Sequence, residues 1–298
     1  MNKFRKYLTD ISLVYTAAIW GSTFYLVKDT LNYIHPVALL AYRFSIAALI
    51  LAVFLLFKKI NIFKNFSTGF VTGILLWAIY TPQTIGLQYT TASNSGFITG
   101  LFVVFLPIFS FIFAREIPSM IKIAAVIISI TGLWVLTGGL SGMNFGDMLT
   151  LITALACAAH VFVVDRFVKN QVDPYILCFQ QFFIVGILSF VLAFIFRVPL
   201  VMSAPRAGWI IIFLALFPTL SAFVIQLSAQ RYTAPLKVSF IFALEPVFAA
   251  IFAWTLGGEV FVTSRAIGGL MIFIAILMYD FSFKELKSFL FSITKGHN

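Results

Sequence analysis

The chain has 298 residues, of which 61% are hydrophobic and only 10% are charged, and its formal net charge is +10. A soluble globular domain carries about a quarter of charged residues, so this composition excludes that class and predicts a membrane protein. The basic residues are spread over short loops and tails, which argues against nucleic acid as a partner and favours anionic lipid headgroups.

Ten apolar segments follow one another along the chain. A helix rises about 1.5 Å per residue, so about 20 apolar residues span the hydrocarbon core of a membrane. We therefore predict an all-α integral membrane protein with ten transmembrane helices. The predicted spans are residues 11–27, 36–57, 66–87, 93–113, 120–137, 147–164, 174–196, 206–229, 234–256 and 263–281.

The first span follows a basic cluster, as the apolar part of a signal peptide would. It runs on into further spans without an obvious cleavage site, so we interpret it as a retained first helix.

The distribution of cations between the spans predicts their orientation, because lysine and arginine are held back from translocation. Fifteen of these residues fall on the side that carries both termini, and Arg43 lies within the second span. Only four fall on the other side, namely Lys28, Arg197, Arg206 and Arg265. Both termini are therefore predicted to be cytoplasmic.

The sequence also repeats itself. Residues 89–116 align without a gap with residues 232–259, at an offset of 143 (232 − 89). The identical pairs include Tyr89/Tyr232 and Glu116/Glu259, and those between them recur with the spacing of one helix face. Residues 32–44 align in the same way with 170–182.

Each repeat holds five predicted helices, residues 1–140 in the first and 141–298 in the second. Because five is odd, the second repeat must cross the membrane in the opposite sense, which gives a 5+5 inverted-topology repeat. Such a pair can rock about a central site and expose it to either side in turn.

Three motifs carry a family resemblance. They are GLQYTTASNSGFITGL at residues 86–101, LEPVF at 244–248 followed by GE at 258–259, and IWGS at 19–22. Together they resemble the EamA-type transporters of the drug/metabolite transporter superfamily, over essentially the whole chain. The resemblance implies two EamA-like repeats in a bacterial cytoplasmic (inner) membrane, which carry small metabolites and often export amino acids or related compounds.

Glu245 is the only acidic residue near the middle of a predicted span. An intramembrane carboxylate is costly and should face a cavity or the bundle interior, where it could carry a proton. The alternative is a structural carboxylate beside Pro246, and both interpretations stay open.

Arg43 is the matching cation, about 10 Å below the outer surface by helical rise. It could hold a substrate carboxylate, but at that depth it could equally reach the headgroups. Its partner in the second repeat is Gln181.

Other polar and aromatic residues within the spans are further candidates for substrate contact or for interhelical hydrogen bonds. These candidates are Trp20, Tyr80, Gln83, Asn94 and His160. Prolines within four spans remove helical hydrogen bonds and invite kinks, which makes them candidate gating residues. These prolines are Pro82, Pro107, Pro218 and Pro246.

No motif for an enzyme emerges. The chain lacks a phosphate-binding loop, a metal-binding His/Cys cluster and a G-x-S-x-G motif. We therefore predict no catalytic residue, metal or cofactor, and expect a secondary transporter of a small metabolite, with protons as a candidate coupling ion and export as the favoured direction. A channel, a lipid-handling protein and an intramembrane enzyme are the alternatives.

Overall fold

The structure is a computed structural model that describes residues 3–102, 105, 119–139, 142–169, 172–230, 241–242 and 244–280. Within these ranges the chain forms helices and short connections and no strand. In chain order the elements are α1 (Lys3–Thr30), α2 (Pro36–Phe57), α3 (Phe66–Gly86), α4 (Ala92–Gly100), α6 (Met120–Thr137), α7 (Phe145–Lys169), α8 (Pro174–Ile195), α9 (Pro205–Leu214), the π-helix η1 (Ala215–Ser221), α10 (Ala222–Gln230), α12 (Glu245–Thr255) and α13 (Thr263–Asp280).

Proline and a polar cap define the starts of two equivalent helices. Pro36 opens α2 after His35, whose side chain accepts from Val37 N, and Pro174 opens α8 after Asp173, which accepts from Tyr175 N. Proline suits the first helical turn because its missing N–H has no partner there in any case. The predicted bounds of these two helices agree with the structure to within one residue.

Two predicted spans are described only in part. The span predicted at 93–113 begins as α4, and of its residues after 102 only 105 is described. The span predicted at 234–256 is described from residue 241, and its α12 begins at Glu245. The span predicted at 206–229 consists of three elements, α9, η1 and α10, rather than one regular helix.

Four stretches among the described residues are long and apolar enough to cross a membrane, judged by length and composition. They are Pro36–Phe57, Phe145–Val164, Pro174–Ile195 and Pro205–Ala229. Large apolar side chains also point outward from the bundle, including Phe57 at 84% exposed, Phe194 at 87% and Trp209 at 74%. Lipid is the solvent that suits such surfaces.

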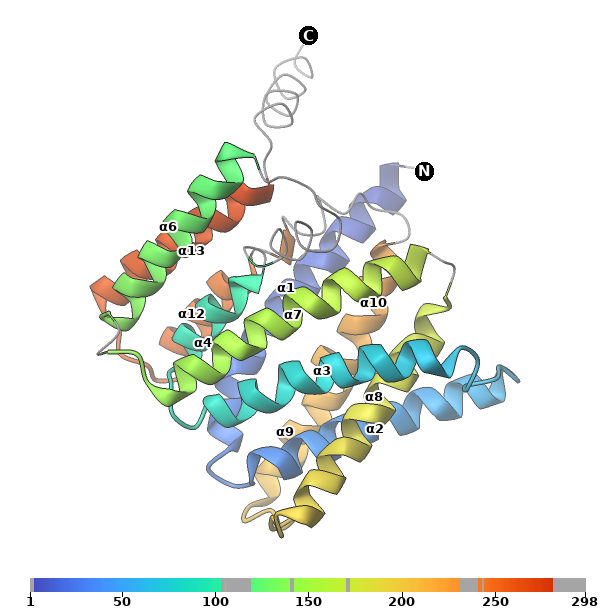
Figure 1. Ribbon diagram of the computed structural model, residues 1–298. Helices are drawn as coiled ribbons and strands as arrows, with labels where there is room; N and C mark the ends of the chain where they lie inside the picture. The colour runs from blue at the N-terminus through green and yellow to red at the C-terminus, as the bar shows by residue number, and fades with distance from the viewer. Residues whose placement is uncertain are drawn as a thin grey trace.

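The helices pack in pairs from the two halves of the sequence. α2 packs on α8, and α6 packs on α13 (Figure 1). The α6/α13 pair lies at one end of the bundle and the α2/α8 pair at the other, with α1, α4 and α7 between them. α12 packs on α1 and α4, and α3 packs on α7 and α8.

Glycines allow several of these helices to approach closely. A Cβ at Gly69 would lie 2.4 Å from Gln180 Cβ, and one at Gly73 would lie 2.7 Å from Ile184 Cβ, so α3 lies close against α8. A Cβ at Gly96 would lie 2.5 Å from Ala249 Cβ, where α4 meets α12. Small residues at contacts are how helices associate in membranes.

Candidate functional site

A π-helical turn around Pro218 organises the centre of the bundle. Proline has no N–H, so the carbonyl of Leu214 loses its usual partner four residues on. The Thr219 hydroxyl donates to Leu214 O at 2.8 Å instead. At the end of the turn, Ala222 N–H bonds to Phe217 O and Thr219 O, which leaves the carbonyl of Pro218 for a partner outside the helix.

Trp20 and Arg43 donate hydrogen bonds to oxygen atoms of this turn. Trp20 Nε1 donates to Pro218 O at 2.8 Å, and Arg43 Nε donates to Thr219 Oγ1 at 2.7 Å. These bonds join α1 and α2 to η1 in the second half of the chain. π-turns are frequent at functional sites.

Arg43 is buried rather than directed to the lipid headgroups. Its side chain is 1% exposed, which favours the interior interpretation over snorkelling. Its Cζ lies 5.3 Å from the centre of the Phe44 ring and 5.0 Å from that of Tyr80, within the range of cation–π attraction. Its Nη2 atom is buried and has no hydrogen-bond partner among the described residues.

A row of packed aromatic rings connects Arg43 to Trp20. Tyr80 lies 4.8 Å from Phe44 and 6.5 Å from Phe223 between ring centres, and Trp20 lies 5.3 Å from Phe223. We call Trp20, Arg43, Phe44, Tyr80, Thr219 and Phe223 the arginine cluster. Trp20 and Tyr80 are only half-buried, although they lie inside the bundle.

Glu245 lies next to this cluster. It is the first residue of α12 and is half-buried, and it is close enough to Tyr80 and Cys157 for electrostatic interaction. A Cβ at Gly21 would lie 2.9 Å from Glu245 O, so the backbones of α1 and α12 are nearly in contact there. Its place in the first turn of a helix also favours a negative charge, which suits the structural interpretation.

The remaining polar candidates take part in separate contacts between helices. Gln83 Nε2 donates to Thr99 Oγ1 at 3.2 Å, which joins α3 to α4. His160 Nε2 lies 2.7 Å from Gln181 Oε1, which joins α7 to α8, and both residues are buried. Asn94 is buried near the start of α4, and its Oδ1 has no described partner. No described contact links these four residues to Arg43.

The candidate gating prolines differ in setting. Pro82 lies inside α3, which is one uninterrupted α-helix, whereas Pro218 lies in the π-turn. Pro246 occupies the first turn of α12, where the helix restarts. Pro107 lies outside the described residues.

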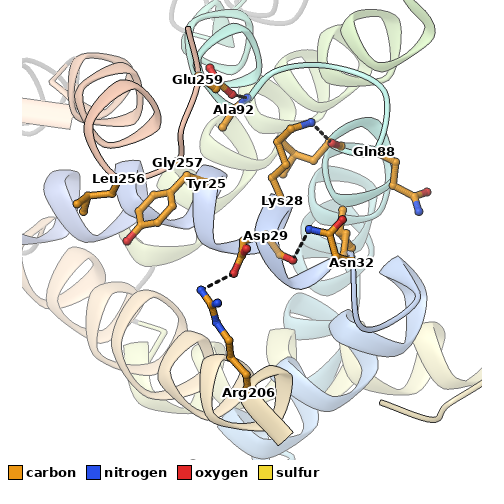
Figure 2. Close-up of a pocket in the computed structure, with 12 residues that line it drawn as sticks. Tyr25, Lys28, Asp29, Asn32, Gln88, Ala92, Arg206, Leu256, Gly257 and Glu259 are labelled. Carbon is orange, nitrogen blue, oxygen red and sulfur yellow. Dashed lines mark hydrogen bonds and ion pairs between the residues drawn. The ribbon is translucent and has the colours of Figure 1, made fainter. Parts of the chain in front are cut away.

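A pocket of about 410 Å³ opens where four segments end or begin (Figure 2). The end of α1, the α3–α4 connection, the start of α9 and the residues after α12 form its wall. We call it the end pocket. Its polar lining residues include Tyr25, Lys28, Asp29, Arg206 and Glu259.

The charged residues of the end pocket bind one another and the backbone. Lys28 Nζ donates to Leu87 O at 2.9 Å and Thr90 O at 2.5 Å, so α1 holds the α3–α4 connection. Arg206 Nη2 lies 2.9 Å from Asp29 Oδ2, which joins α9 to α1.

Glu259 reaches the N-terminus of α4. Its carboxylate accepts from Ala92 N, and also from Ser93 Oγ at 2.6 Å and Ser93 N at 3.3 Å. A carboxylate is favoured at a helix N-terminus. The contact means that the end of α12 and the start of α4 are held together at the rim of the end pocket.

Sequence reasoning missed several of these residues. Thr219 and Phe223 gave no signal beyond their nearness to Pro218, and Lys28 and Arg206 were noted only as charges between spans. A threonine directly after an intramembrane proline was the one available indication of the π-turn.

Comparison with known proteins identifies the family. The sequence profile of the EamA-like transporter family matches the chain twice, at residues 8–138 and 144–279. The chain belongs to the EamA-like transporter family. This family is part of the drug/metabolite transporter superfamily, so the protein is a multi-pass membrane protein that acts on a small-molecule substrate.

Relatives of this EamA-like chain carry transporter names. A protein of Archaeoglobus fulgidus named "Uncharacterized transporter" is 34% identical over 92% of this chain and 86% of its own. The Bacillus subtilis protein named "Uncharacterized transporter YyaM" is 25% identical over 86% of this chain and 88% of its own. These names indicate a transporter rather than an enzyme.

A solved crystal structure shows a similar fold. It superposes with a TM-score of 0.66 at 17% identity, over 90% of this chain and 95% of its own. At this identity the likeness concerns the fold alone.

Proposed function

We propose that this EamA-like protein is a secondary active transporter that moves a small metabolite, an amino acid or a related compound, by alternating access. We favour export as the direction. We further propose that it lies in a bacterial cytoplasmic (inner) membrane with both termini in the cytoplasm.

The observation that carries this proposal is the placement of Arg43 and Glu245 beside Tyr80 inside an apolar bundle. Ionisable groups within a membrane are costly to insert and mark substrate or ion pathways. Trp20 and Thr219 connect this position to helices from both halves of the chain. A site shared by both halves is what alternating access requires.

The 5+5 inverted repeat is supported by the packing of equivalent helices. A two-fold axis brings an element of one repeat against its own counterpart in the other. α2 and its counterpart α8 are in contact, as are α6 and its counterpart α13. The two matches of the family profile, which divide the chain between residues 138 and 144, agree with repeats of 1–140 and 141–298.

The end pocket lies on the side that the cation distribution predicts to be external. It is therefore our candidate for the outer entrance of the pathway. The Asp29–Arg206 ion pair joins the two halves there, since α1 belongs to the first repeat and α9 to the second.

Proton coupling through Glu245 can be tested in vesicles that contain the purified protein. Glu245→Gln keeps the size of the side chain but cannot ionise. We expect this variant to lose accumulation driven by a pH gradient and to retain exchange of labelled for unlabelled substrate, with amino acids as the first compounds tried. Accumulation equal to that of the wild type would exclude Glu245 as the proton carrier.

The orientation can be tested with two exposed serines, in a protein whose Cys157 and Cys178 are replaced by alanine. Ser203 precedes α9 at the predicted outer side, and Ser67 is the second residue of α3 at the predicted inner side. In intact cells an impermeant thiol reagent should label Ser203→Cys and spare Ser67→Cys. The reverse pattern would overturn the assignment of the termini to the cytoplasm.

A further inference from the structure

Arg43 has no counter-charge among the described residues. None of their carboxylates lies within 4.0 Å of its guanidinium nitrogens. Burying an ion without a partner costs several kcal/mol even after relaxation of the protein. Since Arg43 is 1% exposed and its Nη2 is unpartnered, the described residues leave one donor of a buried cation without an acceptor.

The guanidinium of Arg43 is held by its neighbours, and its Nη2 has no acceptor among the described residues. Thr219 Oγ1 accepts from Nε, and that hydroxyl is fixed in turn by its bond to Leu214 O. The rings of Phe44 and Tyr80 lie against the guanidinium carbon. A planar, pre-positioned guanidinium matches the two oxygens of a carboxylate or phosphate.

The charge of the site favours a single negative charge on the ligand. Arg43 is the only lysine or arginine among the buried residues of the described chain. A phosphate monoester carries about −1.5 to −2 charges near neutral pH and would need a second cation. A carboxylate fits this balance better than a phosphate.

The surroundings of Arg43 favour an apolar body. The half-buried residues Trp20 and Tyr80 both place their rings against that of Phe223, with ring centres 5.3 Å and 6.5 Å away. Aromatic walls with few polar groups suit a flat or hydrophobic ligand.

We propose that the arginine cluster binds compounds with one carboxylate as their only anionic group and an apolar or aromatic body, with the carboxylate on Arg43 and the body against Trp20, Tyr80 and Phe223. This inference rests on the proposed transport function and names the substrate class of that same site.

The test uses the full-length protein in lipid nanodiscs and benzoate as the probe. The unfolding temperature is measured against increasing benzoate, benzamide, terephthalate and inorganic phosphate at constant ionic strength. A ligand that binds the native state raises this temperature. We expect a saturable rise with benzoate and none with the neutral amide, the dicarboxylate or phosphate. An equal rise with benzamide, terephthalate or phosphate would overturn the proposal.

Variants localise the effect. Arg43→Lys keeps the charge but loses the planar fork, and it should weaken benzoate binding by about tenfold or more. Arg265→Gln removes an exposed arginine of α13 and should bind benzoate as the wild type does. Unchanged affinity in Arg43→Lys would refute the assignment. If Arg43→Lys does not fold, the comparison of the four ligands on the wild-type protein still tests the proposed ligand class.

Transport measurements in vesicles that contain the purified protein distinguish this inference from the transport function. If benzoate does not bind while the protein still exchanges a neutral metabolite, the substrate class is wrong and the transport function stands. If benzoate binds through Arg43 and no tested compound, benzoate included, crosses the membrane, the binding site stands and the transport function is refuted.

Discussion

The contact between α6 and α13 depends on the absence of a side chain at Gly268. A Cβ there would lie 2.4 Å from Leu136 N and 2.7 Å from Gly132 O. Both are backbone atoms and cannot rotate away, so the two helices would have to move apart. Overpacking of this kind costs about 1–3 kcal/mol or more, and the better helix propensity of alanine returns at most about 1 kcal/mol.

We therefore expect Gly268→Ala to lower the free energy of unfolding by about 2 kcal/mol. Gly208 in α9 provides the matched control, because a Cβ there meets only Met202 Sδ, at 3.9 Å. Gly208→Ala should be neutral or stabilise by up to about 1 kcal/mol. Thermal unfolding in detergent, followed by tryptophan fluorescence, compares the two variants with the wild type. If Gly268→Ala unfolds at or above the temperature of Gly208→Ala, the argument from close backbone contact is wrong.

Two further predictions concern the ends of helices. Glu259→Ala removes the carboxylate that accepts from Ala92 N and Ser93 Oγ. At this partly exposed position we expect the free energy of unfolding to fall by about 2 kcal/mol. In a double-mutant cycle with Ser93→Ala, strictly additive losses would contradict a direct bond between Glu259 and Ser93. Burial lowers the pKa of His35, whose Nδ1 caps α2, so the unfolded chain binds a proton more readily than the folded one. The contribution of His35 to the free energy of unfolding should be constant above about pH 6.5 and should fall as the pH drops from there toward the lowered pKa of the folded state. Asparagine caps a helix without titrating, so His35→Asn should remove this pH dependence. Equal slopes of unfolding free energy against pH for both proteins would refute the role of His35.

The sequence was sufficient to predict most described helices and their ends. Proline after a polar cap marks the starts of α2 and α8, and charged or glycine-containing connections mark where apolar runs stop. These signals are local, so they can be read without knowledge of the packing. Gly69 and Gly73 are four residues apart and therefore share one face of α3, where both make close contacts with α8.

The candidate site was harder to predict because it depends on which face of each helix is inside. α2 carries apolar residues on every face, so its sequence does not say which way Arg43 points. Burial of Arg43 follows from the position of Thr219, which is 176 residues away in the chain. Likewise His160 and Gln181 satisfy each other across two helices, and nothing in the local sequence of either indicates that pairing.

A π-turn contains one residue more than the same stretch of α-helix. The presence or absence of η1 can therefore be recognised in an alignment of related sequences. Removing one residue from such a turn converts it into ordinary helix while the flanking faces keep their directions. A relative whose alignment shows a one-residue gap between positions 215 and 221 would therefore keep the bundle but present neither the Pro218 carbonyl nor the Thr219 hydroxyl in this way. We expect such sequences to differ in cargo, and gap placement would then divide the family by specificity before any of its members is assayed.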